Sequence, residues 1–272
     1  IARFKDGGFE NLTMQEGLIC NNVSSFCDAS DGGLWVGTPS GLSLIQGGKI
    51  TNYTLRSGSA PEGVTALAQD RTGGLWVGTN TGTLRHFKDG AWTTFGPKYG
   101  SPASLVTTLA SIYRDIEGTL WIGSSGGLIR FKDGKSTVFT RKNGLFSDFI
   151  YQVLEDDRGR LWMTCNRGVF VVSKKELDEQ ALGKIERVTG RVYDTSDGMK
   201  SAECNGGGAP AGCRRRDGRL CFPTMVGLAV IAPARIRRDT TPPSTALEGI
   251  MDDGEPLPLV QGLLLRAGVR RI

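Results

Sequence analysis

The sequence predicts an all-β protein built as a β-propeller, and three observations carry this prediction. The segment "DGGLWVGTPSGL" begins at Asp31, and similar segments begin at Arg71, Ile116 and Asp157. Each places three apolar residues in a row, which is typical of a strand buried on both faces. Glycine is abundant, at 39 of 272 residues, and lies on both sides of these apolar runs, where strands end in turns. Strands that carry a tryptophan and recur every 40–45 residues or so are typical of propeller blades.

Each repeat should contain four strands. In the second repeat we expect them at Val64–Gln69, Leu75–Gly78, Leu84–Phe87 and Ala91–Phe95. Segments such as "DRTGG" and "KDGA" separate consecutive strands and combine aspartate with glycine, which predicts hairpin turns. The alternative role for these aspartates, calcium binding, is disfavoured because the ligand spacing of an EF-hand is absent.

The second strand of each repeat marks one blade. The blades are centred on Trp35, Trp76, Trp121, Trp162 and, in a weaker fifth copy, Cys221. We expect these strands at Leu34–Gly37, Leu75–Gly78, Leu120–Gly123, Leu161–Thr164 and Leu220–Thr224. The tryptophans should be wedges between neighbouring blades, and Cys221 should bury less area, so the fifth blade should pack more loosely.

The blades are expected over residues 1–238. Residues 1–13 should be the outer hairpin left from a preceding blade, so the propeller is incomplete, with about five four-stranded blades plus a partial one in an open or poorly closed ring. Before the fifth blade, "MKSAECNGGGAPAG" should be irregular chain. There we favour close packing of the three glycines Gly206 to Gly208 over ligand contact, so that replacing Gly207 with valine should lower the melting temperature.

Bulk properties exclude few classes of protein. The net charge of +5 is mild, no apolar run is long enough for a membrane span, and no signal peptide is present. Because the chain begins with isoleucine, we expect an internal piece of a longer protein. The six cysteines include no Cys-x-x-Cys pair, which argues against zinc. Cys213 and Cys221, on adjacent predicted strands, are the better candidates for a disulfide, although free buried thiols remain the favoured interpretation.

The repeat G-x-L-W-[VI]-G-[TS]-x-x-G, with "KDG" downstream, resembles the two-component regulator propeller repeat. The segment from Ser201 to Arg237 resembles the last blade of that family, which usually carries tryptophan at the positions of Cys213 and Cys221. Residues 239–272 resemble a linker, stiffened by Pro242 and Pro243, and the truncated start of the immunoglobulin-like β-sandwich, the three-tyrosine domain, that follows the propeller.

This resemblance implies an extracytoplasmic, periplasmic ligand-sensing module of a bacterial two-component receptor whose kinase lies outside this sequence. It implies a carbohydrate or other small polar ligand, a homodimer through the same region, no nucleic acid, and a membrane only through the parent protein. We expect no catalytic residue, metal site or cofactor, because the chain has one histidine and no nucleophile or phosphate-loop motif. The alternatives are a propeller enzyme, either a lyase or a glycosidase, and a protein-interaction scaffold.

Ligand-binding residues are expected on one face of the disc. The loops between blades are long and varied, and they share that face with the turns between second and third strands. Arginine, asparagine and tyrosine there suit an acidic or hydroxyl-rich ligand. The candidates are Arg56, Asn80, Lys98, Tyr99, Arg141, Lys142, Asn143, Asn166 and Arg167. The sole histidine, His86, should be a surface or edge side chain.

Overall fold

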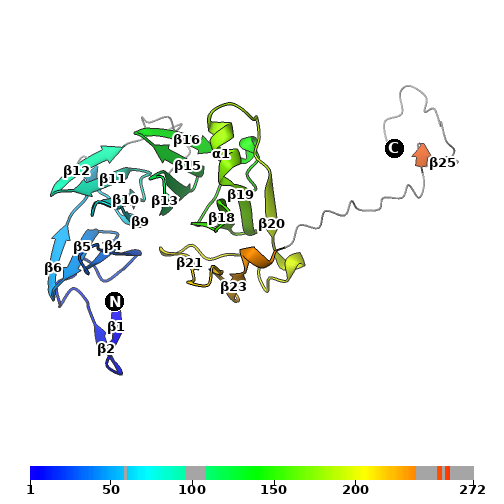
Figure 1. Ribbon diagram of the computed structural model, residues 1–272. Helices are drawn as coiled ribbons and strands as arrows, with labels where there is room; N and C mark the ends of the chain where they lie inside the picture. Colours follow the sequence, from blue (N-terminus) through cyan, green and yellow to red (C-terminus); the bar gives the residue numbers. More distant parts are fainter. Residues whose placement is uncertain (58–59, 96–107, 237–249, 253–254, 258–272) are drawn as a thin grey trace. The chain divides into compact units, whose positions relative to one another are not determined.

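The computed structural model describes residues 1–57, 60–95, 108–236, 250–252 and 255–257 (Figure 1). The chain divides into two units, Ile1–Arg235 and Ile236–Ile272. No helix among the described residues is long and apolar enough to cross a membrane.

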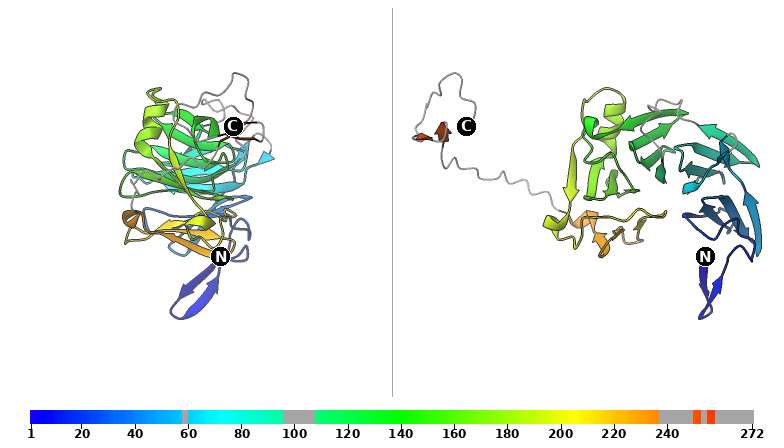
Figure 2. Two further views of the ribbon diagram at one scale, coloured as in Figure 1. Left: turned by 90° about the vertical axis from the view of Figure 1, so that its right-hand side faces the viewer. Right: turned by 180° about the vertical axis from the view of Figure 1, so that it is seen from behind.

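Five antiparallel sheets of the first unit are blades 1 to 5 in chain order, and the predicted all-β propeller is confirmed (Figures 1 and 2). Blade 1 comprises β3 (Ser25–Asp28), β4 (Leu34–Thr38), β5 (Gly41–Gln46) and β6 (Lys49–Tyr53). Blade 2 comprises β9 (Val64–Gln69), β10 (Leu75–Thr79), β11 (Leu84–Lys88) and β12 (Ala91–Phe95). Blade 3 comprises β13 (Leu109–Arg114), β14 (Leu120–Ser124), β15 (Gly127–Lys132) and β16 (Lys135–Phe139).

Blade 4 comprises β17 (Gln152–Glu155), β18 (Arg160–Cys165), β19 (Gly168–Ser173) and β20 (Gly190–Tyr193). Blade 5 has only three strands, β21 (Cys213–Arg214), β22 (Leu220–Thr224) and β23 (Gly227–Ile231). The expectation of four strands per blade therefore holds for four blades. In the fifth, β23 has an open edge among the described residues, and its Leu228 and Val230 are 62% and 47% exposed.

The tryptophans are wedges between blades, as predicted. The indole of Trp35 meets the Phe87 ring of blade 2 edge-on at 5.9 Å, and Trp76 meets Phe131 of blade 3 at 5.7 Å. Trp121 belongs to one buried cluster with Leu161 and other apolar residues of blade 4. Aromatic pairs at these distances add to the burial of apolar area, so the second strands of blades 1 to 3 each fasten their blade to the next one.

The innermost strands lie side by side from blade to blade, β3 with β9, β9 with β13, and β13 with β17. One further bridge joins the two ends of this series. The amide of Phe26 donates to the Ala209 carbonyl at 3.0 Å, and the amide of Ala209 donates to the Ser24 carbonyl at 2.8 Å. The ring thus closes at its inner rim, while the outer strand of blade 5 remains uncovered.

Residues 1–13 do form a hairpin, β1 (Ala2–Lys5) with β2 (Gly8–Asn11), which pairs with no other sheet of the described chain. Its Phe4 and Phe9 are 65% and 74% exposed. A short hairpin of β7 (Arg56–Ser57) and β8 (Ala60–Pro61) lies between blades 1 and 2. In the second unit, β24 (Ile250–Asp252) pairs with β25 (Glu255–Leu257), and the immunoglobulin-like domain stays a prediction.

The helical segments were not anticipated. An α-helix, α1 (Lys174–Ala181), is inserted between β19 and β20 and buries Leu177 against blade 4. Three single-turn 3₁₀ helices occur at η1 (Arg141–Asn143), η2 (Thr195–Asp197) and η3 (Pro233–Arg235).

The glycine run before blade 5 packs closely, but not at the residue we chose. A Cβ on Gly207 would meet only the side-chain oxygen of Asn205, at 3.5 Å, which is an ordinary contact. A Cβ on Gly206 would instead overlap the ring of Tyr151. The close packing predicted for the glycine run is therefore found at Gly206, which needs the absence of a side chain, and Gly207 was the wrong position for the test substitution.

Candidate functional site

The aspartates of the turns between first and second strands are structural. In blade 4 the Asp156 Oδ1 accepts the amides of Arg158 and Arg160 at 2.9 and 3.1 Å, and Oδ2 accepts the indole N–H of Trp162 at 2.7 Å. Asp115 makes the same set of bonds in blade 3. The carboxylate thus fixes both the turn and the wedge, as the hairpin interpretation requires. Among the described residues, no group of three or more His, Cys, Asp or Glu side chains is arranged to hold a metal ion.

In blade 2 the histidine replaces the indole as the partner of this aspartate. His86 Nε2 lies 2.7 Å from Asp70 Oδ2, and its ring stacks on Trp76 with centroids 4.1 Å apart. Burial opposes ionisation of Asp70, but hydrogen bonds from Thr72, His86 and Gly74 outweigh it and lower the pKa to about 2. The His86 side chain is 17% exposed, bonds to Asp70 and stacks on Trp76. The expectation of a surface or edge side chain was therefore wrong.

Two of the predicted ligand-binding residues hold loops in place. Asn80 Oδ1 accepts the amide of Gly63 at 3.0 Å, and Asn143 Oδ1 accepts the amide of Thr140 at 2.9 Å. These side-chain oxygens fix the loops before blades 2 and 4. That these residues bind a ligand stays a prediction.

The other predicted residues fall into two groups beside these loops. Arg167 lies over the Phe146 ring at 4.5 Å and donates to the Phe146 carbonyl, and Arg141 and Lys142 lie in η1 of the same loop as Phe146. Arg56 accepts a bond from Arg85 at its carbonyl and lies on the side of blade 2, as Asn80 does. Asn166 is exposed in the turn between β18 and β19. Lys98 and Tyr99 lie outside the described residues.

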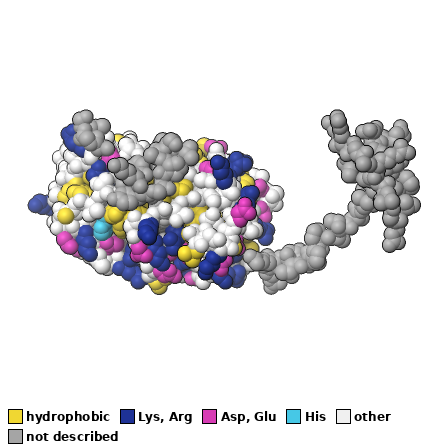
Figure 3. Space-filling model, turned by 90° about the horizontal axis from the view of Figure 1, so that it is seen from above, with side chains coloured by type: hydrophobic (Ala, Val, Ile, Leu, Met, Phe, Trp, Pro, Cys, Tyr) yellow, Lys and Arg dark blue, Asp and Glu magenta, His cyan; other side chains and the backbone are white. Residues whose placement is uncertain are grey.

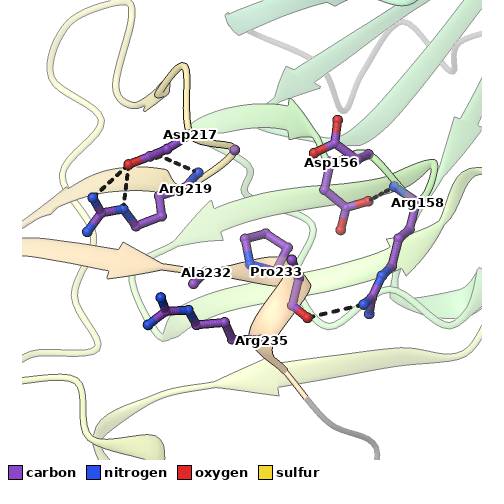
Figure 4. A pocket seen from close by; sticks show the side chains of 10 residues that line it. Asp156, Arg158, Asp217, Arg219, Ala232, Pro233 and Arg235 are labelled. Atoms are coloured by element: carbon purple, nitrogen blue, oxygen red, sulfur yellow. Dashed lines mark hydrogen bonds and ion pairs between the residues drawn. The ribbon is translucent and has the colours of Figure 1, made fainter.

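A pocket of about 280 Å³ lies at the ends of the strands opposite the predicted loop face (Figure 4). It is formed by the first turns of blades 4 and 5 and by η3. The Arg158 side chain crosses it and donates to the Ala234 carbonyl at 3.2 Å. The lining residues are Asp156, Asp157, Arg158, Asp217, Gly218, Arg219, Ala232, Pro233, Ala234 and Arg235.

The electrostatics of this pocket favour an anion or a hydroxyl-rich molecule. Asp156 is paired with Arg160 at 2.7 Å, Asp157 with Arg214, and Asp217 with Arg219 at 2.6 Å. The hydrogen bonds from Arg219 lower the pKa of Asp217 to about 2, so it is ionised at neutral pH. All three carboxylates therefore have a cation, whereas Arg158 and Arg235 form no ion pair with a carboxylate in the described chain. Their positive charges have no carboxylate partner there, although Arg158 also donates to the Ala234 carbonyl.

Sequence reasoning missed this pocket, although the basic turns "DDRGR" and "RRRDGR" that form two of its walls were visible. The third wall is η3, which follows β23. Only the folded structure shows that η3 lies beside blade 4. Elsewhere the surface is mixed: on the side of the first unit seen in Figure 3, acidic and basic side chains are interspersed.

A buried ionic network ties α1 to blade 3. Lys174 at the start of the helix lies 2.8 Å from Glu155 Oε1 and 3.4 Å from Asp115 Oδ2. The Tyr113 hydroxyl donates to Glu155 at 2.9 Å. Burial opposes the charge of Lys174, but the two carboxylates raise its pKa overall, so the cation is retained. Every member has a partner, which indicates a structural role.

Comparison with known proteins finds one family model that matches part of the chain. A family model described as "Two component regulator propeller" matches residues 17–40, 58–81 and 144–167. Each match spans the loop before a blade, its first strand, the aspartate turn or its counterpart, and the second strand. A search of curated proteins found no significant match.

Solved structures support the fold. The extracellular domain of a protein described as a hybrid two-component system of B. thetaiotaomicron aligns with a TM-score of 0.56 at 20% identity, over 94% of this chain and 40% of that one. Virginiamycin B lyase from Staphylococcus aureus aligns with a TM-score of 0.56 at 16% identity, over 77% and 69%. A catalytically inactive histidine-to-alanine variant of that lyase, solved with quinupristin, aligns with a TM-score of 0.55 at 16% identity, also over 77% and 69%. This chain thus spans about two fifths of the ectodomain it matches.

Proposed function

We propose that this chain is part of the extracytoplasmic ligand-sensing region of a bacterial two-component receptor. The observation that carries the proposal is the in-register match of three repeats to the two-component regulator propeller model. The ectodomain of a hybrid two-component system has the same fold along 94% of this chain. A periplasmic location and a kinase output beyond this sequence follow from the proposal.

The ligand we propose is a small polar molecule, such as an oligosaccharide, with acidic or hydroxyl groups. Two places could receive it. The loop face offers Arg141, Arg167 and the other predicted residues, and the pocket offers Arg158 and Arg235. Two guanidinium groups without a carboxylate partner favour the pocket, because a guanidinium can bind a carboxylate through two parallel hydrogen bonds.

An enzyme is the alternative, because virginiamycin B lyase shares the fold. That lyase loses activity when one histidine becomes alanine. In this chain the only histidine, His86, bonds to Asp70 and stacks on Trp76 inside blade 2. A histidine held in this way is not available to a substrate, so we favour sensing without chemistry. A protein-interaction scaffold remains the third alternative.

Isothermal titration of neutral and acidic oligosaccharides into the full chain tests the proposal. Binding without turnover of the sugar supports a sensor. Turnover of the bound molecule would establish the enzyme instead, and absence of binding across the screen would favour the scaffold.

Two double variants then locate the site. If the pocket binds, Arg158→Ala with Arg235→Ala should weaken affinity tenfold or more, because each charged hydrogen bond contributes about 1.5–3 kcal/mol. If the loop face binds, Tyr99→Ala with Arg141→Ala should have that effect. Lys135→Ala, at an exposed hairpin remote from both, is the control and should leave affinity unchanged.

A further inference from the structure

Two cysteines face each other across the first hairpin of blade 5. Cys213 on β21 is the direct cross-strand partner of Cys221 on β22. Partners in antiparallel strands have Cα atoms about 4.5–5.5 Å apart, which lies within the range of roughly 4.4–6.8 Å that disulfides span. Both are free thiols in the structure. The pair therefore has the backbone geometry of a disulfide without the bond.

The two thiols differ in exposure. Burial, and next the adjacent Cys213 thiol, raise the pKa of Cys221. Cys221 is only 6% exposed, whereas Cys213 is exposed. An external reagent can therefore reach Cys213 first, with Cys221 positioned directly behind it.

We propose that Cys213 and Cys221 are a redox-modification site that closes to a disulfide by exchange with a small-molecule disulfide. The Cys213 thiolate attacks one sulfur of the reagent and releases one thiol, which leaves a mixed disulfide on Cys213. The Cys221 thiolate then attacks the Cys213 sulfur and releases the second thiol. The reagent is reduced to two thiols, and the protein loses two hydrogen atoms and gains one S–S bond.

The bond would constrain one wall of the pocket. The closed loop, residues 213–221, contains Asp217, Gly218 and Arg219, which all line the pocket. It would also fix β21, which has two residues, to β22 in the blade that has only three strands. Oxidation should therefore hold the turn of blade 5 in one arrangement. The chemistry of the bond itself does not depend on the pocket binding a ligand.

The other cysteines provide the contrast. Cys165 and Cys204 lie near each other, since both thiols point at the Gly168 carbonyl at 3.6 and 3.7 Å. They are 0% and 3% exposed, and burial raises the pKa of Cys204 to about 11. Folded protein should therefore keep this second pair reduced when a water-soluble disulfide is the reagent.

The test is to treat the reduced, folded full chain with oxidised glutathione, block free thiols, and map the peptides by mass spectrometry. We expect a Cys213–Cys221 disulfide. The other four cysteines should all be recovered as alkylated thiols, and the buried ones should react only after unfolding. The melting temperature of the oxidised protein should rise by several degrees. Alkylation of Cys213 and Cys221 as free thiols, or a lasting glutathione adduct on wild-type Cys213, would overturn the proposal.

Variants separate the two steps. Cys221→Ser should trap glutathione on Cys213, because no thiol remains to displace it. Cys213→Ser changes an exposed side chain and should leave Cys221 reduced, so it keeps the test decisive should the first variant fold poorly. Cys20→Ser is the matched control and should form the disulfide as the wild type does. If the Cys213→Ser protein still formed a disulfide, between other cysteines, the assignment of the redox site to Cys213 and Cys221 would be contradicted.

Discussion

Blades 4 and 5 are neighbours built from the same repeat, yet they are held together differently. In blade 4, Trp162 is fully buried and bonds to Asp156, and four strands complete the sheet. In blade 5, Cys221 stands at the tryptophan position. Arg215 stands at the position of Asp156, because its backbone amide donates to the Arg219 carbonyl as that of Asp156 donates to the Arg160 carbonyl. The sheet has three strands. The comparison teaches that blade 5 lacks both the aspartate and the tryptophan that are bonded to each other in blade 4, together with the cover that a fourth strand gives.

The largest difference should appear at the wedge position. Trp162→Ala removes a fully buried indole and should cost about 3–5 kcal/mol, because the surrounding strands cannot close the cavity. For a domain of this size that lowers the melting temperature by roughly 10 °C. Cys221→Ala removes one sulfur and should cost far less. Thermal unfolding of both variants tests the comparison, and equal shifts would show that blade 5 packs as tightly as blade 4.

The turn aspartates should differ next. Asp156→Ala leaves two backbone amides and the Trp162 indole N–H without their acceptor, and each buried unpaired donor costs about 1–3 kcal/mol. Asp217 also accepts a turn amide, from Arg219, but it is exposed, so water can replace its bonds. Asp217→Ala should therefore have a much smaller effect in denaturant unfolding. A loss for Asp217→Ala as large as that for Asp156→Ala would refute a structural role specific to the buried turn.

The third strands give a matched apolar pair. Val169 of β19 and Leu228 of β23 occupy equivalent positions, one residue after the glycine that begins each strand. Val169 is 0% exposed and Leu228 62%. Val169→Ala should cost about 2 kcal/mol, and Leu228→Ala should stay within about 0.5 kcal/mol. If Leu228→Ala proved as costly, another segment or molecule would have to cover β23 in solution.

The junction between the two blades depends on one glycine. Gly206→Ala should cost about 1 kcal/mol or more, because the new methyl group meets the Tyr151 ring and the ring must shift. Gly207→Ala is the control, since its Cβ has room. If the unfolding curves of the two variants coincided, close packing would be a property of the whole segment rather than of Gly206.

The sequence alone was sufficient for the blades because their signal is local and repeated. Four apolar runs, each followed by glycine or by a small turn, predicted the second strand of each of blades 1 to 4 to within two residues. These runs surround Trp35, Trp76, Trp121 and Trp162. The helix α1 was missed because it is a single charged insertion that no other repeat shares. Its Leu177 and Ala181, one turn apart, were the available signal.

Roles that depend on contacts across the fold could not be read in advance. His86 is the direct cross-strand neighbour of Trp76, and only that register brings it to Asp70. Asn80 and Asn143 looked like exposed polar residues, but their oxygens accept loop amides. The pocket needs blade 4, blade 5 and η3 together, so no single stretch of sequence contains it.

The smallest effect should come from the exposed ion pair of blade 5. Hydrogen bonds from Arg219 lower the pKa of Asp217 to about 2, below the value of about 3.9 expected in the unfolded chain. The contribution of this pair to stability is therefore complete above about pH 4 and is lost as the pH falls towards 2, because the unfolded state takes up the proton first. Asp217→Asn should be less stable than the wild type near neutral pH, and the difference should vanish at about pH 2. Because both side chains reach solvent, high salt should shrink it as well. Thermal unfolding of the two proteins at both pH values measures this, and a difference that persists in acid and in salt would mean that Asp217 acts through the turn amide of Arg219 rather than through its charge.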